Sequence, residues 1–225
     1  RGEGNPYALN QKLSAAQSWH ELLETIQRET NIAKRGSAGT MNSVNFSTAI
    51  HRLARFAARG NYRQDRAAIL ADPRTALLLA SLAEALADKT VSFRARECSN
   101  IAWALAKLKL PPPLAAFPRQ NKASLSDAAT QVRQSIMDAT VARQQGNPVV
   151  AAQWIQALSR LAGHTMDIIQ DFVLEDDEIS RSSFQMQELA ILLWSWATVG
   201  RASNEAFRIV LHDMIQQTEQ RLLDN

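Results

Sequence analysis

The sequence predicts an all-α fold, an α-solenoid of antiparallel helical hairpins with an N-terminal capping helix. Composition favours helix, since alanine and leucine dominate and only 8 Gly and 7 Pro interrupt the 225 residues. Strands find little support, because β-branched residues rarely alternate with polar ones. Four segments also share one pattern of apolar residues, which is typical of a helical-repeat architecture.

The first expected helix covers residues 18–30 and caps the stack. Its apolar residues are spaced to lie on one face: Trp19, Leu22, Leu23 and Ile26. We therefore divide the chain into an N-terminal extension with this capping helix, residues 1–41, and a repeat domain, residues 42–225.

The repeat is recognised by its first helices, which we expect at residues 44–56, 97–109, 150–161 and 188–199. They align when one position of each is set level: Leu53, Leu105, Leu158 and Trp196. Apolar residues precede each level position by seven, four and three places, which is the spacing of one helix face. A small residue follows each level position, as expected where a neighbouring helix approaches closely: Ala54, Ala106, Ser159 and Ala197.

Each first helix is followed by a second amphipathic stretch, so that the unit is a helical hairpin. We expect these second helices at residues 72–88, 125–145, 165–174 and 203–223. Breaks separate the helices at the following residues: Gly60, Pro111, Pro112, Pro113, Gly146, Gly163 and Gly200. The level positions are 52, 53 and 38 residues apart, and the extra length of the first two steps is assigned to loops or short added helices.

Charge is distributed unevenly along the chain. Residues 1–120 carry 17 Lys and Arg against 9 Asp and Glu, whereas residues 121–225 carry 8 against 13. The first part is therefore expected to attract phosphate and the second is not. No apolar run is long enough to span a membrane. The single cysteine, Cys98, excludes an internal disulfide, suggests a reducing compartment and is expected to be buried.

The sequence carries no motif that points to catalysis. It contains no Gly-rich phosphate loop, no Cys/His zinc spacing and no Gly-x-Ser-x-Gly elbow, so we expect no enzyme and no cofactor. The strongest enzymatic alternative is a metal-dependent nuclease, because one set of side chains is spaced to line a helix stripe: His164, Asp167, Asp171, Glu175 and Glu178. An exposed acidic face is the preferred interpretation of this set.

Residues 98–115 read CSNIAWALAKLKLPPPLA. This segment resembles the octotricopeptide repeat, a helical-hairpin repeat of organellar gene-expression proteins. The resemblance rests on the run from Trp103 to Leu108 at the end of the first helix and on the three prolines that follow. The step of 38 residues between Leu158 and Trp196 agrees with the period of that family. The resemblance covers most of residues 42–216, strongly in one unit and weakly in three.

The resemblance implies RNA association inside an organelle, for which the mitochondrial matrix is preferred to the chloroplast stroma. The RNA would be ribosomal or an organellar messenger RNA, and the chain would act within an organellar ribosome or in transcript maturation and translation. Its other partners would be proteins of a ribonucleoprotein complex, with no membrane and no small-molecule substrate. Uneven steps and lost proline turns favour a clamp on structured RNA over an orderly reader of single-stranded sequence.

Basic side chains supply the candidate RNA contacts. Arg52, Arg55 and Arg59 follow intervals of 3 and 4, so that they form a stripe suited to phosphates. The alignment also places Arg55, Lys107 and Arg160 at one equivalent position, which predicts a shared basic ridge. The full candidate set is Arg52, Arg55, Arg59, Arg63, Arg66, Arg94, Arg96, Lys107, Lys109, Arg119, Lys122 and Arg160.

Aromatic residues are interpreted mainly as core. Tyr62 is a candidate for stacking on a base, and His51 is expected to be a packed or capping residue. The repeat tryptophans are expected to be buried and not to form stacking platforms: Trp103, Trp154, Trp194 and Trp196. Two alternatives to RNA binding stay open. In the first, Lys and Arg are only solvent-facing residues of the outer helix faces. In the second, the chain is a protein scaffold whose acidic half docks a basic partner.

Overall fold

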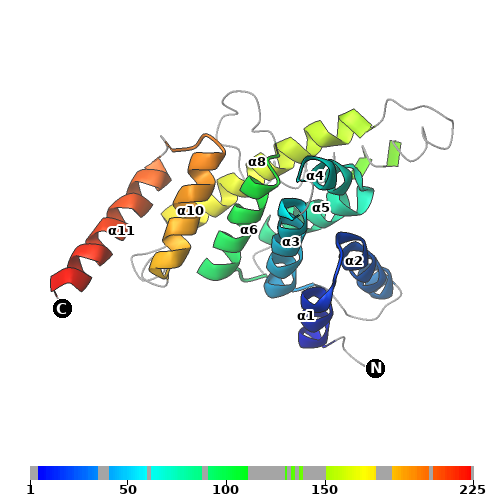
Figure 1. Cartoon of the computed structure of the whole chain (residues 1–225), viewed down its shortest axis with the longest axis horizontal. Helices are drawn as coiled ribbons and strands as arrows, with labels where there is room; N and C mark the ends of the chain where they lie inside the picture. The colour runs from blue at the N-terminus through cyan, green and yellow to red at the C-terminus, as the bar shows by residue number, and fades with distance from the viewer. Residues whose placement is uncertain are drawn as a thin grey trace.

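The computed structural model describes residues 5–34, 41–59, 62–87, 91–110, 130, 133–134, 137–138, 151–175, 184–202 and 205–223. Its elements there are all helices, which confirms the predicted all-α class (Figure 1). The helices are α1 (Pro6–Ala15), α2 (Trp19–Lys34), α3 (Ser43–Ala58), α4 (Tyr62–Ala71), α5 (Pro73–Ala87), α6 (Ala95–Lys107), α8 (Ala151–Glu175), α10 (Met186–Thr198) and α11 (Glu205–Leu223). No described helix is long and apolar enough to cross a bilayer.

Two helices cover the N-terminal end of the fold. The predicted capping helix is α2, whose first turn is capped by the Ser18 hydroxyl, accepting from the Glu21 backbone N–H at 3.2 Å. Its predicted apolar residues Leu22, Leu23 and Ile26 are buried, as expected. Helix α1 was not predicted, because its ten residues carry only a weak apolar pattern. It packs mainly against α3.

Three helices, α3, α6 and α10, lie side by side and form what we call the front layer (Figure 1). The side chains of Glu97 and Glu188 accept from the backbone N–H groups at the N-caps of α6 and α10, each at 2.9 Å. The three level positions of this layer are almost fully buried: Leu53, Leu105 and Trp196. The alignment of the first, second and fourth predicted repeats is therefore confirmed as one set of neighbouring helices.

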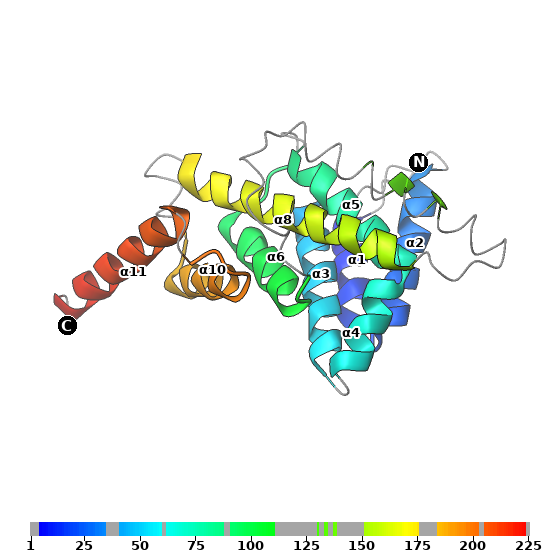
Figure 2. The ribbon, with the colours of Figure 1, turned by 90° about the horizontal axis from the view of Figure 1, so that it is seen from above.

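The third predicted hairpin is wrong. Residues 151–175 form one continuous helix, α8, which passes through Gly163. A single glycine within a helix costs only about 1 kcal/mol, and the apolar face continues across it at Leu158, Ala162, Met166, Ile169 and Val173. Helix α8 lies behind the front layer and packs mainly against α5 (Figure 2). Within the front layer the neighbour of α6 is therefore α10, and α8 makes only a smaller contact with α6.

The remaining helices, α4, α5 and α11, connect the helices described above or pack beside them. Helix α4 is one of the short added helices expected in the first step. Helix α5 starts after Asp72, whose carboxylate accepts from the Arg74 backbone N–H at 2.8 Å. Gly200 has a φ of +78° and ends the turn after α10, and α11 then returns alongside α10 (Figure 1). The predicted helix 125–145, apart from a few residues, and the prolines 111–113 lie outside the described residues.

Candidate nucleic-acid interface

One exposed surface runs across all three helices of the front layer. On each helix a stripe with spacing 4, 3 and 4 is partly or fully exposed. Because the helices are in register, equivalent positions of neighbouring helices form rows across the layer. We call this surface the front face, and its residues are Val44, Thr48, His51 and Arg55 of α3, Arg96, Asn100, Trp103 and Lys107 of α6, and Gln187, Ile191, Trp194 and Thr198 of α10.

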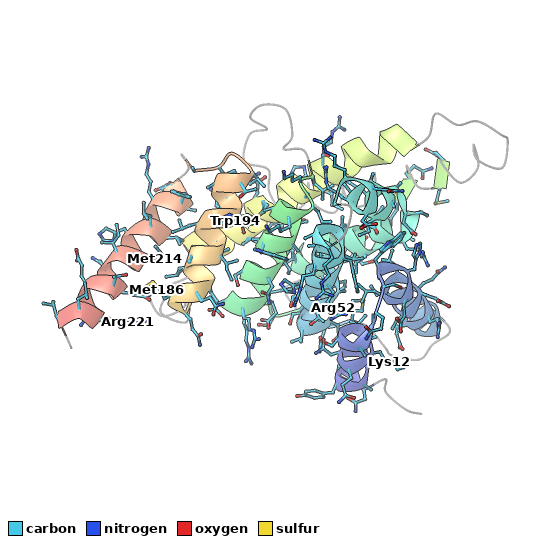
Figure 3. The ribbon with its side chains drawn as sticks, viewed as in Figure 1. Lys12, Arg52, Met186, Trp194, Met214 and Arg221 are labelled. Carbon is cyan, nitrogen blue, oxygen red and sulfur yellow. The ribbon has the colours of Figure 1, made fainter. Side chains whose placement is uncertain are left out.

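An aromatic row crosses the middle of the front face, formed by His51, Trp103 and Trp194. The rings of His51 and Trp103 are in contact, with centroids 4.7 Å apart and planes inclined by 42°. Trp194 is 40% exposed on α10 (Figure 3). Its predicted burial is therefore wrong, whereas Trp196 is fully buried as predicted. Two residues correspond to about 200° around a helix, so these two side chains leave α10 on nearly opposite sides.

A groove lies between α6 and α10 at the end of this row. It has a volume of about 380 Å³ and is lined by Trp103, Lys107, Gln187, Ala190, Ile191 and Trp194. The Lys107 ammonium stands 4.8 Å from the centroid of the Trp194 ring and 5.8 Å from that of Trp103. These are cation–π distances. The groove therefore combines two indole rings with one positive charge.

A basic row lies next to the aromatic row, formed by Arg55 and Lys107 at equivalent positions of α3 and α6. Arg55 is exposed, as are Arg59 at the end of α3 and Arg63 on α4. Burial, together with the charges of Arg55 and Arg52, lowers the pKa of His51 below its ordinary value. The row is therefore a positively charged edge beside a neutral imidazole at physiological pH.

Two candidate arginines hold helices together. Arg52 donates to the backbone carbonyl of Ala16 at the end of α1, and its guanidinium lies 5.3 Å from the Phe56 ring centroid. Burial, followed by repulsion from Arg55 and Arg59, lowers its pKa. Arg66 donates to the carbonyls of Leu108 and Lys109, at 2.6 and 2.7 Å, and so caps the end of α6. Both guanidiniums already have protein acceptors.

The other candidate cations are spread over several elements. Arg96 is exposed on the front face, while Arg94 and Lys109 are exposed at the two ends of α6. Arg160 is exposed on α8, behind the front layer, so the predicted ridge from Arg55 through Lys107 to Arg160 is not formed. Arg119, Lys122 and the side chains of Tyr62 and Trp154 lie outside the described residues.

The acidic stripe of the metal-site alternative has a structural partner. Asp167 accepts a hydrogen bond from Arg201, which also donates to the carbonyl of Gly163 at 3.2 Å. His164 Nδ1 is 4.0 Å from an Asp167 oxygen, and burial lowers the His164 pKa. Across the described part of the chain, no three His, Cys, Asp or Glu side chains are grouped to hold a metal ion.

Comparison of the chain with protein-family models, with curated proteins and with solved structures gave no match. The resemblance to the octotricopeptide repeat therefore rests on the residues quoted above. It stays a prediction, as does the RNA association that it implies.

Proposed function

We propose that this protein is an RNA-binding helical-repeat protein that holds structured RNA against the front face. In this proposal it works in an organelle, in the mitochondrial matrix, as an added component of the ribosome or in transcript maturation and translation. The observation that carries the proposal is the pair of parallel rows, with the cations Arg55 and Lys107 beside the aromatic side chains of His51, Trp103 and Trp194.

The two rows match the two chemical parts of RNA. Phosphates bind to Lys and Arg through charge, and this gives affinity without sequence preference. Bases stack on aromatic rings, a contact that any base can make. The front face presents both kinds of group side by side on rigid helices, where neighbouring axes are typically about 8–10 Å apart.

The proposal is tested by charge reversal at Arg55 and Arg59, two exposed residues of α3 and its C-terminal end. Arg52 is left intact, because its reversal would break the bond to Ala16 that joins α1 to α3. The control is the double reversal of Arg160 and Arg208, which are exposed on α8 and α11 and change the net charge equally. RNA affinity is measured for both variants as a function of salt concentration.

The Arg55→Glu and Arg59→Glu variant should bind RNA more weakly, and the slope of log affinity against log salt should fall by about 2, one for each lost phosphate contact. The control should retain the wild-type slope. Equal loss in the two variants would show that only net charge matters, and the front face would then have no part in binding. RNA recovered after crosslinking would separate ribosomal from messenger targets.

A second candidate function is a protein scaffold, which one feature of α11 favours. This helix exposes an apolar stripe, with Leu211, Ile215 and Leu222 exposed by 38, 48 and 74%. A scaffold's partners should survive ribonuclease treatment in a pull-down and be lost in a variant carrying Leu211→Glu and Ile215→Glu. Loss of every partner on ribonuclease treatment would eliminate this candidate.

A further inference from the structure

We propose that the groove between α6 and α10 binds a single unpaired nucleobase of an RNA, stacked on Trp194, with the adjoining phosphate at Lys107. This inference rests on the proposed function and adds a substrate class, RNA that carries an unpaired base in a bulge, loop or end. Sequence reasoning missed this site, because it assigned Trp103 and Trp194 to the core.

The walls of the groove suit a flat ring. Trp103 and Trp194 come from adjacent helices, and the apolar side chains of Ala190 and Ile191 also line the groove. Its volume, about 380 Å³, lies within the range typical of small-molecule sites. Trp194 is 40% exposed, so an indole surface remains for an incoming base to cover. Covering such a surface is the usual source of base–aromatic stacking energy.

The positive charge of Lys107 limits which ligands the groove can bind. Lys107 already places an ammonium against both indoles, which disfavours a cationic ligand such as a methylated lysine. A planar group joined to an anion satisfies both features, and a nucleotide is such a group. Gln187 also lines the groove, where an amide can donate to and accept from the edge of a base.

The base must be unpaired. In a duplex each base is stacked on its neighbours and its faces are covered, so only an extruded or single-stranded base can enter a groove between two helices. This restriction does not apply to the exposed cations of the front face, because paired and unpaired RNA both present phosphates. Binding of phosphate and binding of a base can therefore be separated by experiment.

The test compares two RNA hairpins, each closed by a non-nucleotide linker so that neither has unpaired loop bases, one with a single bulged purine and one in which the bulge is deleted. The bulged position carries a fluorescent purine analogue whose emission is quenched on stacking. Three variants are used. Trp194→Leu keeps an apolar side chain without a π-face, Trp194→Phe keeps a smaller π-face, and Leu77→Ala is a control at a side chain of nearly equal exposure, 39%, on α5.

The wild type should bind the bulged hairpin more tightly and quench its fluorescence. Trp194→Leu should weaken this binding about tenfold, the size of one base–aromatic stack, and abolish the quenching. Trp194→Phe should keep most of the affinity for the bulged hairpin and most of the quenching. Leu77→Ala should change neither the affinity nor the quenching. Binding of the fully paired hairpin should be the same in all four proteins.

The failures of the two proposals can be told apart. If neither hairpin binds, the proposed RNA-binding function is wrong. If both hairpins bind equally and Trp194→Leu has no effect on either, the RNA function stands and the groove proposal is overturned. Circular dichroism of each variant checks folding. If Trp194→Leu alone loses helix, the result for Trp194→Phe decides, and this variant must then still quench the fluorescence of the bulged base.

Discussion

Arg201 offers a direct test of the contact between α8 and the turn that follows α10. This residue follows α10 in the chain, yet its guanidinium donates to Asp167 and to the Gly163 carbonyl, both on α8. The two contacts join α8 to the turn that follows α10. The replacement Arg201→Ala removes both contacts while leaving the backbone bond from Arg201 N to the Trp196 carbonyl, at 2.7 Å, in place.

The size of the effect follows from exposure. The Asp167 side chain is 40% exposed, so solvent screening limits the ion pair to about 1 kcal/mol. The bond to the Gly163 carbonyl adds about 1 kcal/mol. Arg201→Ala should therefore lower the free energy of unfolding by about 2 kcal/mol. Asp167→Ala should lower it by about 1 kcal/mol, and the double variant should show a coupling energy of about 1 kcal/mol.

Urea unfolding of the wild type, both single variants and the double variant completes the cycle. Arg208→Ala is the control, since this arginine is exposed on α11 and its loss should change stability by less than about 0.5 kcal/mol. Strict additivity of Arg201→Ala and Asp167→Ala would refute the contact between Asp167 on α8 and Arg201 in the turn between α10 and α11.

Two further predictions concern the front layer. Trp196→Ala should lower the free energy of unfolding by about 3–5 kcal/mol, because Trp196 is fully buried, whereas Trp194→Ala should lower it by less than about 1 kcal/mol. Urea unfolding of both variants measures these two losses. Equal losses would contradict the placement of the two tryptophans on opposite sides of α10. Stability should also fall with acid. The pKa of His51 is lowered from 6.5 in the folded protein, so below pH 6.5 the unfolded chain takes up a proton that the folded chain does not, and the stability present above pH 6.5 is progressively lost. His51→Gln should reduce the slope of stability against pH, measured between about pH 8 and pH 5. His164, whose pKa is also lowered, should account for the slope that remains. An unchanged slope in His51→Gln would contradict the burial of the His51 imidazole.

The front layer was predictable because its signal is local. The buried positions before Leu53, Leu105 and Trp196 repeat at the spacing of one helix face, and this spacing depends only on the geometry of the helix. The placement of α8 was not predictable in this way. Its apolar residues fit the same local pattern, and the choice between front and back depends on packing with α5, which is distant in sequence.

The candidate site was predicted only in part. The exposed Arg55 and the equivalence of Arg55 and Lys107 follow from spacing. The structural roles of Arg52 and Arg66 do not, since their acceptors lie 36 and 42 residues away along the chain. One signal for the aromatic row was present, because the position shared by His51 and Trp194 falls outside the apolar positions that precede each level residue.

The position of α8 also affects how the protein unfolds. In an ordinary solenoid each unit touches only its neighbours, so that the array can fray from one end. Here a helix of 25 residues, about 37 Å long, contacts α4, α5 and α6 and also α11. The helix acts as a strut that ties the first unit to the last. Separating a terminal hairpin must therefore also break its contacts with α8, so the described fold should unfold as one cooperative unit.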